Sequence, residues 1–293
     1  MVITKLQGGL GNQMFQYAAA RGISPDSPVY LDTRFLDNAV ASSDQFTARS
    51  YELSVFSNLQ ARRPSDRLLR ILENPGRRYR IARNILYPRL SRVVQQENEF
   101  VAELATATSP VILEGYFQSE IYFRSIREQL LQEFAFPELT GENRERQDHI
   151  LHQPGAVSIH IRRGDYTKPS IQQYHGLMSL DYYRKAIEEM EAWIDNPFYF
   201  IFSDDPAWCR ANLAAGRPDM KVMDSLPGSA AWEDLFLMTQ CRHHIIANSS
   251  FSWWGAWLGT APDAVNMAPA NWFNPAVVKF DIHHIVPANW HIL

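Results

Sequence analysis

Hydrophobic and polar positions follow two alternating patterns along most of the chain. Short runs such as residues 2–6 and 198–202 are rich in β-branched and aromatic residues, which favour strands. Between such runs, apolar residues recur three or four positions apart, as they do in residues 180–193, and this is the spacing of one helix face. Strands that alternate with helices predict an α/β fold with parallel, doubly wound sheets.

The predicted elements form two series. Strands are expected at residues 2–6, 29–31 and 111–113, and then at 156–161, 198–202, 221–223, 244–247 and 264–268. Helices are expected at residues 12–21, in two arginine-rich segments on either side of Pro75-Gly76, at 119–134, 180–193 and 206–213, from Ser229 to Cys241, and at 251–258. The polar stretch 137–153 is interpreted as the passage between two domains, placed at 1–150 and 151–293, which suits a chain of 293 residues.

Three strands of the second series end in polar side chains. Residues 156–161 run into His160, Arg162, Arg163 and Asp165. The next two clusters are Ser203-Asp204-Asp205 and Asn248-Ser249-Ser250. Because ligands of doubly wound sheets bind beyond the carboxyl ends of the strands, we expect the three clusters to converge at one edge.

Each cluster has a binding interpretation, and the serine and aspartate clusters also have a structural one. Arg162 and Arg163 suit a diphosphate, because guanidinium groups bind phosphate oxygens bidentately. Ser249 and Ser250 stand at a helix start, where hydroxyl and N–H groups bind phosphate or only cap the helix. The two adjacent aspartates accept hydrogen bonds from a base or ribose, or favour the dipole of the following helix.

A glycine-rich loop follows the first strand. Gly8, Gly9 and Gly11 resemble a dinucleotide-binding fingerprint, but Met14 takes the place of its third glycine. We interpret the loop as a turn that lets the backbone approach a ligand.

We expect no metal and no cofactor. The sequence contains no D-x-D, and its histidine pairs, His243-His244 and His283-His284, are adjacent, so their side chains point in different directions. The two cysteines, Cys209 and Cys241, are isolated, which favours free thiols in a reducing compartment.

Charge is unevenly distributed along the chain. The net charge of −4 argues against general nucleic-acid binding. From Arg62 to Arg92, ten arginines and two acidic residues give +8, so the remainder carries −12. This segment is either a solvated arginine face or a patch for an anionic membrane surface or a phosphorylated acceptor.

The N-terminus shows no signal-peptide pattern, and no apolar run approaches the length of a membrane span, which is about 20 residues. We therefore expect a cytoplasmic protein, with peripheral contact at the inner membrane face as the alternative.

Six motifs in order along the chain resemble the α-1,2-fucosyltransferases of glycosyltransferase family 11. They are GGLGNQMFQYA at 8–18, GYFQS at 115–119, HIRRGDY at 160–166, HGLMSLDYY at 175–183, FSDD at 202–205 and NSSFSWWGAWL at 248–258. The H-x-R-R-x-D element is also similar to that of α-1,6- and protein O-fucosyltransferases.

The resemblance implies a GT-B-type fold, with two Rossmann-like domains facing a cleft. The N-terminal domain would help hold a β-galactoside and the C-terminal domain GDP-fucose. The implied reaction is inverting, metal-independent transfer of L-fucose to the galactose 2-hydroxyl, and the chain resembles a bacterial member. A different linkage, transfer to protein, and a non-catalytic nucleotide-sugar or glycan-binding module remain alternatives.

Site residues follow from the motifs and their chemistry. The donor-binding set is His160, Arg162, Arg163, Asp204, Asp205, Asn248, Ser249, Ser250, Phe251, Gly9 and Gly11. Arg162 would stabilise the charge that develops on the β-phosphate, helped by Arg163 and His160, and one of the adjacent aspartates would bind guanine. Asp165 is our choice of base, Asn12 could only orient or polarise, and His175 is a further candidate. Gln13, His175 and Trp253 are the acceptor-side candidates.

Overall fold

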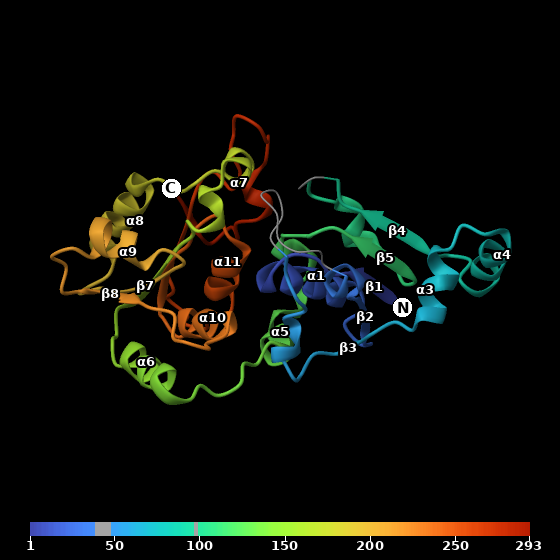
Figure 1. The fold of residues 1–293 in the computed structure, drawn as a ribbon, viewed down its shortest axis with the longest axis horizontal. Helices are drawn as coiled ribbons and strands as arrows, with labels where there is room; N and C mark the ends of the chain where they lie inside the picture. The colour runs from blue at the N-terminus through green and yellow to red at the C-terminus, as the bar shows by residue number, and fades with distance from the viewer. Residues whose placement is uncertain (39–47, 97–98) are drawn as a thin grey trace. The chain divides into compact units, whose positions relative to one another are not determined.

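Two compact α/β units make up the chain. The computed structural model describes residues 1–38, 48–96 and 99–293, and the division between the units lies at Ala135 and Phe136. Each unit is built on one parallel sheet (Figure 1). The predicted α/β class, with a Rossmann-like domain in each unit, is confirmed in these two sheets.

Short strands and helices alternate in both units. The strands are β1 (Val2–Lys5), β2 (Val29–Asp32), β3 (Ala61–Arg62), β4 (Ser91–Val94) and β5 (Val111–Glu114), then β6 (Ala156–Ile161), β7 (Phe198–Ser203), β8 (Met220–Met223), β9 (His243–Ile245), β10 (Asn266–Ala268) and β11 (His291–Ile292). The helices are α1 (Leu10–Ile23), α2 (Arg34–Asp37), α3 (Asp66–Glu73), α4 (Arg77–Leu86) and α5 (Arg127–Glu133), then α6 (Gly141–Leu151), α7 (Pro169–His175), α8 (Leu180–Trp193), α9 (Pro206–Cys209), α10 (Ala231–Thr239) and α11 (Ser250–Trp257).

The sheet of the first unit has the strand order β3-β2-β1-β5-β4. Helix α1 packs on it through an almost continuous buried surface that includes Phe15 and Tyr17. Arg21 at the end of α1 forms a buried ion pair with Glu133 of α5, with 2.8 Å between Nη2 and Oε1. This pair joins the first and last helices of the unit.

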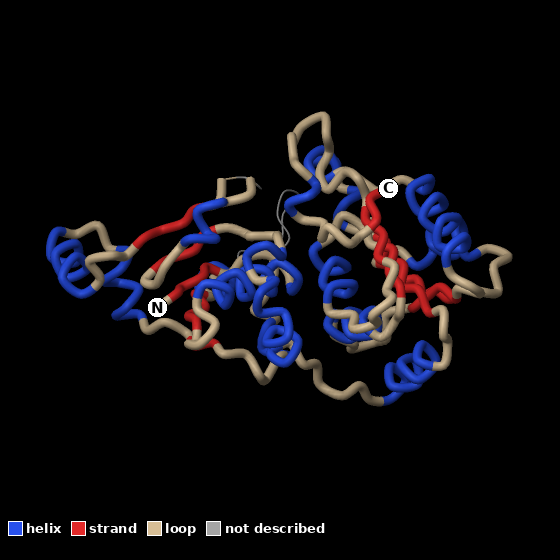
Figure 2. Tube along the Cα trace, turned by 180° about the vertical axis from the view of Figure 1, so that it is seen from behind, coloured by secondary structure: helices blue, strands red, loops and turns tan. Residues whose placement is uncertain are grey.

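The sheet of the second unit has the order β11-β10-β9-β6-β7-β8, and helices cover both of its faces (Figure 2). Every residue of β6 is buried. On one face, Val157 and Ile159 pack in a cluster with Ile187 and Met190 of α8. The chain runs from β6 through β7 to β8 and then returns to β9 on the other side of β6, so the strand order reverses at β6. Crevices at such reversals are where doubly wound sheets bind ligands.

Helix α6 occupies the stretch that the sequence analysis interpreted as a passage between domains. It buries Asn143, Arg146 and Ile150, and Arg146 donates to the carbonyl of Asp224 at 2.6 Å. The structural division therefore lies before α6, whereas the sequence analysis placed it at residue 150. Because the buried face is largely polar, it has no apolar period that could have revealed the helix.

The helix predicted at 119–134 is wrong in its first half. This part forms two short 3₁₀ turns at 120–122 and 124–126, and α5 follows. Phe123 interrupts them with φ −145° and a fully buried ring. Close packing explains the break, because a Cβ at Gly22 would lie 2.0 Å from the Tyr122 carbonyl oxygen.

Smaller differences concern caps and edges. Ser229 does not cap α10, since Ala230 holds that position and donates its N–H to Glu233 at 2.8 Å. The short strands β3, β4 and β11 and helix α7 were not predicted. None of the helices in residues 1–38, 48–96 and 99–293 combines the length and apolar character that crossing a bilayer requires.

Candidate functional site

The polar clusters that follow β6, β7 and β9 meet at one edge of the second sheet. β6 lies between β9 and β7, and the three strands are parallel, so their carboxyl ends are neighbours. Arg162 after β6 contacts Asp204 after β7, and the His160 ring lies 5.7 Å from the Phe251 ring at the start of α11. The predicted convergence of these clusters is therefore confirmed.

Both arginines are held by carboxylates from the neighbouring strand. Arg162 Nη1 lies 2.9 Å from Asp204 Oδ2, and Arg163 Nε lies 3.1 Å from Asp205 Oδ2. Each guanidinium also lies over an aromatic ring, that of Arg162 at 5.7 Å from the Tyr166 centroid. That of Arg163 lies 4.2 Å from the centroid of the Trp208 ring. The two cations are thus fixed in position before any ligand binds.

Asp204 also organises the turn after β6. Its Oδ1 accepts hydrogen bonds from the backbone N–H groups of Arg163 at 2.8 Å and Gly164 at 3.0 Å. A Cβ at Gly164 would lie 2.8 Å from Asp204 Oδ2, so a larger residue would displace this carboxylate. Asp204 therefore positions both the turn and the Arg162 side chain.

Asp205 has a different set of partners. Its Oδ1 accepts from the N–H of Trp208 at 3.1 Å and so caps α9, while its Oδ2 accepts from Arg163 Nε. The backbone N–H of Asp205 donates to Ser203 Oγ at 3.0 Å. Asp205 thus lies at the start of the following helix, where the structural interpretation of the sequence had placed an aspartate that favours the helix dipole.

His160 is a buried, neutral imidazole. Burial, and then the neighbouring positive charge of Arg162, lower the pKa of His160 from 6.5 to about 3. Its Nδ1 is buried and has no hydrogen-bond partner among the residues that the structure describes. Burial therefore keeps the ring uncharged at neutral pH, and the predicted help of His160 to Arg162, which stays a prediction, would not come from a positive charge. A neutral ring can still donate one hydrogen bond.

The third cluster, at the end of β9, holds loops in place. Asn248 Nδ2 donates to the carbonyls of His175 at 2.9 Å and Trp272 at 3.1 Å. Ser249 caps α11, with its Oγ accepting from the N–H of Phe251 at 3.3 Å, and Ser250 is the first residue of that helix. Capping by Ser249 is thus confirmed, and phosphate binding by the two serines stays a prediction.

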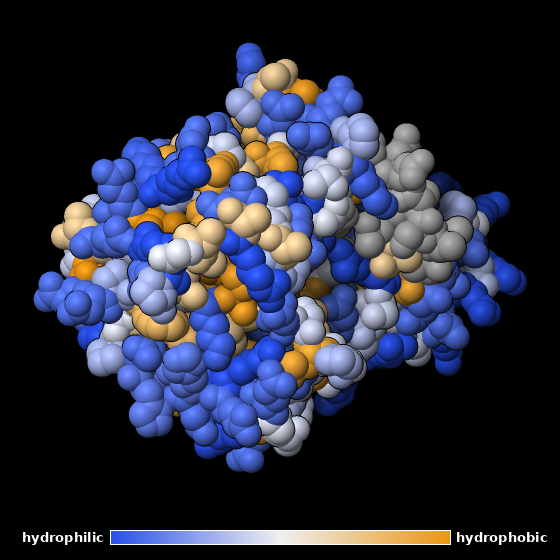
Figure 3. Space-filling model, turned by 60° about the vertical axis from the view of Figure 1, so that its left-hand side comes forward, coloured by the Kyte–Doolittle hydropathy of each residue, from blue (hydrophilic) through white to orange (hydrophobic). Residues whose placement is uncertain are grey.

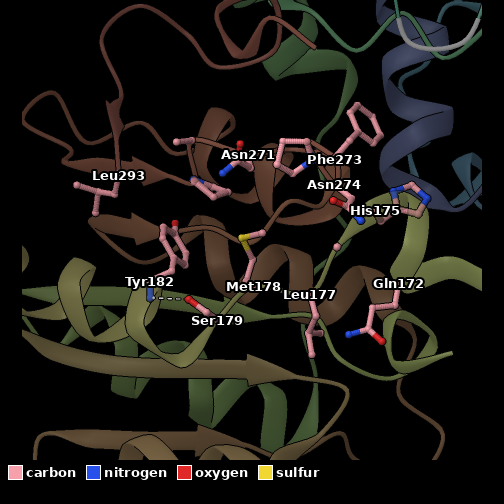
Figure 4. A pocket seen from close by; sticks show the side chains of 14 residues that line it. Gln172, His175, Leu177, Met178, Ser179, Tyr182, Asn271, Phe273, Asn274 and Leu293 are labelled. Carbon is pink, nitrogen blue, oxygen red and sulfur yellow. Dashed lines mark hydrogen bonds between the residues drawn. The ribbon is translucent and has the colours of Figure 1, made fainter. Parts of the chain in front are cut away.

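A pocket of about 400 Å³ opens beside this edge of the sheet. Side chains from α7, the 176–179 loop, α8 and the segment after β10 surround it (Figure 4). Its polar and aromatic lining includes Gln172, His175, Tyr182, Asn271, Phe273 and Asn274.

The pocket is connected to the arginine pair through stacked rings. The His175 ring stacks on Tyr166 with 5.1 Å between the centroids, and the Arg162 guanidinium lies over the same tyrosine. Tyr182 hydroxyl donates to the carbonyl of Ile246 at 2.7 Å and fixes another wall. Sequence reasoning missed Tyr166, Tyr182 and Trp208 as site residues. The first two stand in the quoted motifs, and Trp208 comes three residues after Asp205, so these signals could have revealed them.

Two acceptor-side candidates point into the protein. Trp253 is fully buried and its indole N–H donates to the carbonyl of Ile285 at 2.7 Å. Gln13 is also fully buried and bridges backbone groups of Gly8, Ser50 and Glu52. The prediction that these two side chains contact the acceptor is therefore wrong, because each side chain is enclosed and already hydrogen-bonded.

The glycine-rich loop of the first unit forms a tight turn. Gly8 has φ +78°, and a Cβ there would lie 2.5 Å from Asn12 Nδ2. Gly9 precedes the first residue of α1, and Gly11 is buried within that helix. Asn12 Oδ1 accepts from Gln118 Nε2 at 2.7 Å, which adds Gln118 to the residues around this turn. The donor role of the glycines and the orienting role of Asn12 stay predictions.

The side chain of Asp165 lies outside the described part of the structure. Its backbone belongs to a 3₁₀ turn, Asp165–Thr167, which the N–H of Thr167 closes by donating to the Arg163 carbonyl at 2.8 Å. Its role as base stays a prediction.

The cysteines and the acidic and histidine side chains do not form a metal centre in the described residues. No three of these side chains come together there in a way that could hold an ion. Both cysteines are free and buried, and burial raises the pKa of each thiol. The cysteines were expected to be free thiols, and this is confirmed.

The chain is similar to known glycosyltransferases over nearly its whole length. The model of glycosyl transferase family 11 matches residues 1–293. The O-antigen biosynthesis glycosyltransferase WbnK of Escherichia coli is 34% identical over 92% of this chain and 93% of its own length. An alpha-1,2-colitosyltransferase of Escherichia coli is 30% identical over 93% of this chain and 92% of its own.

More distant similarities extend to animals and plants. A galactoside alpha-(1,2)-fucosyltransferase 1 of Ateles belzebuth is 30% identical, over 50% of this chain and 42% of its own length. Among solved structures, a point mutant of Arabidopsis thaliana FUT1 in complex with GDP has a TM-score of 0.47 and 12% identity, over 91% of this chain and 69% of the other.

Proposed function

Because the chain belongs to glycosyltransferase family 11 and is a transferase, we propose that it transfers L-fucose from GDP-β-L-fucose to the 2-hydroxyl of a terminal β-galactoside. The product would be an α-1,2-fucosylated glycan, and the configuration at the fucose carbon would invert. The name of the Ateles belzebuth relative supports the sugar, the linkage and the acceptor class.

The observation that carries the proposal is the pair of arginines held at the end of β6. Departure of GDP leaves negative charge on the β-phosphate oxygens. Arg162 and Arg163 supply fixed planar donors for this charge, and their ion pairs with Asp204 and Asp205 keep them aligned. Donors that are already oriented need no reorganisation in the transition state.

Asp205 is the better candidate of the two aspartates for binding guanine. Asp204 accepts two backbone N–H groups and one guanidinium, which fills three of its about four acceptor positions. Within the described part of the chain, Asp205 accepts two hydrogen bonds, and its side chain is 36% exposed compared with 27% for Asp204. It therefore has room to accept from the N1–H and the 2-amino group of the base.

Asp165 is the proposed base that accepts the proton of the galactose hydroxyl. It follows the arginine pair in sequence, on a turn next to Gly164 and beside the residues proposed to bind the diphosphate. Asp165→Asn keeps the side-chain shape and removes its basicity, so we expect kcat to fall by about 10²–10⁴ while GDP affinity, measured by calorimetry, is retained. Loss of GDP binding in this variant would instead make Asp165 a brace for the arginines. If kcat and GDP affinity both survive, His175 is the next candidate.

Similarity to the alpha-1,2-colitosyltransferase of Escherichia coli supports colitose as an alternative donor sugar. The colitosyl relative is as similar over nearly the whole chain as the fucosyl relative is over half of it. Transfer of colitose with the same α-1,2 linkage is therefore the alternative activity.

Product analysis tests these assignments directly. The enzyme would be incubated with GDP-fucose and a panel of β-galactosides in metal-free buffer with excess EDTA, and the product linkage would be determined by NMR. We expect an α-1,2-fucosyl product without added metal. A product with another linkage would contradict the proposed α-1,2 bond. A need for magnesium or manganese would contradict metal-independent transfer, and turnover only with a colitose donor would contradict the choice of fucose. Donor binding without transfer or hydrolysis would indicate a non-catalytic module.

A further inference from the structure

Helix α4 in the first unit lies beyond α3, away from the strands of its sheet (Figure 1). None of its ten residues, 77–86, is buried. It is held on its inner side by contacts with α3, including a hydrogen bond from Arg83 Nη1 to the Leu72 carbonyl at 2.8 Å. A helix of this length is only marginally stable in water by itself. Since α4 buries none of its residues, it contributes little to the core of the unit.

The outer side of α4 exposes large apolar side chains. Ile81 is 50% exposed and Ile85 is 72% exposed, and they lie one helical turn apart on the same face. Leu86, at the end of the helix, is 58% exposed. In the second unit, by contrast, exposed apolar residues such as Leu151 and Val277 come from separate parts of the chain, the first from α6 and the second from a turn. On the face drawn in Figure 3, hydrophilic residues interrupt the hydrophobic ones.

Arginines surround this apolar pair. Arg77 lies four residues before Ile81 and therefore on the same face, and Arg78 and Arg80 are exposed beside it. Two more exposed arginines, at 67 and 70, come from α3.

Most of these arginines are not used to pair with acidic side chains. Within the described ranges, no carboxylate pairs with the arginines at 67, 70, 77 and 80, whereas Arg63 and Arg92 pair with Asp37 and Glu114. Helices α3 and α4 lie within the segment 62–92, which carries a net charge of +8, whereas the remaining residues of the protein carry −12. The charge of α4 is therefore available to an anionic partner.

We propose that α4 docks on the surface of an anionic lipid bilayer. Ile81 and Ile85 would enter the boundary between headgroups and acyl chains, and Arg77, Arg78 and Arg80 would contact lipid phosphates. The isoleucine pair favours lipid over nucleic acid, whose backbone would leave these side chains in water. Because the apolar surface is small, binding is reversible and depends on the arginines.

Vesicle flotation of the full-length protein tests this docking. The vesicles contain phosphatidylcholine with about 30 mol% phosphatidylglycerol, or phosphatidylcholine alone. We expect the protein to float with the anionic vesicles at low salt, to stay behind with the neutral ones, and to be released as salt rises toward about 0.5 M. Arg77→Gln/Arg80→Gln should weaken low-salt partitioning by roughly tenfold or more. Ile81→Ser/Ile85→Ser should also weaken it, by removing the inserted side chains.

Matched variants on the second unit provide the control. Arg144→Gln/Arg184→Gln removes the same charge from exposed positions of α6 and α8, and Leu151→Ser/Val277→Ser removes similarly exposed apolar groups. Both should float like the native protein, and circular dichroism checks that every variant is folded. Absence of flotation at low salt, or equal losses in the control variants, would overturn the proposal. So would an isoleucine variant that changes only the oligomeric state, which would assign the face to a second copy of the chain.

Discussion

Arg162 shows how one side chain depends on a partner that is distant in sequence. It follows a fully buried strand, and its guanidinium is oriented by Asp204 from the next strand and by the Tyr166 ring. A planar guanidinium can donate two parallel hydrogen bonds to phosphate oxygens, which an ammonium group cannot do.

Arg162→Lys keeps the positive charge and removes the planar donor. We expect kcat to fall by about 10²–10³, the usual cost of one lost transition-state donor. The measurement is steady-state kinetics with GDP-fucose, and Arg184→Lys on the exposed side of α8 is the control. A native kcat in Arg162→Lys would show that this residue does not stabilise the leaving group.

Asp204 is predicted to act by positioning Arg162. Asp204→Asn can still accept from the N–H groups of Arg163 and Gly164, but it loses the charge that holds Arg162. We expect kcat to fall about tenfold in Asp204→Asn and further in Asp204→Ala, because charge-assisted hydrogen bonds are about twice as strong as neutral ones. KM for the donor should change less than kcat in Asp204→Asn.

The matched control for Asp204 is Asp219→Asn, which breaks a similar pair with Arg217 next to β8. It should leave the kinetics unchanged. If Asp204→Asn and Asp204→Ala are as active as the native enzyme, Asp204 does not position the catalytic arginine.

At the scale of elements, helix pairs are joined by polar contacts as well as by apolar packing. Helix α6 is fixed by Arg146, and α1 and α5 are joined by the Arg21–Glu133 pair, in which both side chains are almost completely buried. Arg21 also donates to the carbonyls of Ser24 and Pro25, so its charge is enclosed by oxygen atoms.

Glu133→Ala should destabilise the first unit strongly. It leaves the buried Arg21 charge without its carboxylate, and we expect a loss of about 3–5 kcal/mol in the free energy of unfolding. Urea unfolding followed by circular dichroism measures this loss. Glu128→Ala, five residues earlier on α5 with its side chain 88% exposed, should change the free energy by no more than about 0.5 kcal/mol. Similar effects of the two variants would contradict the importance of the buried pair.

At the scale of the whole molecule, buried histidines couple stability to pH. Burial lowers the pKa of both His160 and His244 from 6.5 to about 3. Unfolding exposes these rings to water, where they take up protons below pH 6.5. Their contribution to stability is therefore complete above about pH 6.5 and is lost as the pH falls toward 3.

We expect the free energy of unfolding to decrease by up to about 1.4 kcal/mol per pH unit for each histidine between about pH 6 and 4. Urea unfolding at a series of pH values measures this slope. His244→Gln cannot take up this proton, so its slope should be shallower by the contribution of one histidine, whereas His152→Gln at an exposed position should match the native slope. An unchanged slope in His244→Gln would show that His244 is not neutral in the folded protein.

The parallel α/β series, the meeting of the three polar clusters and the arginine-rich helices could all be predicted from the sequence. Hydrophobic periods identify strands and helices, and parallel strands bring their carboxyl ends to one edge whatever the details of packing. Three properties became visible only in the folded chain: Trp253 and Gln13 point inward, α6 is a helix with a polar buried face, and burial keeps His160 uncharged. These properties depend on neighbours far away in sequence: Asp204 binds the backbone of a residue 41 positions earlier. A local sequence pattern cannot predict such neighbours, because burial and hydrogen-bond partners depend on how the helices and strands pack together.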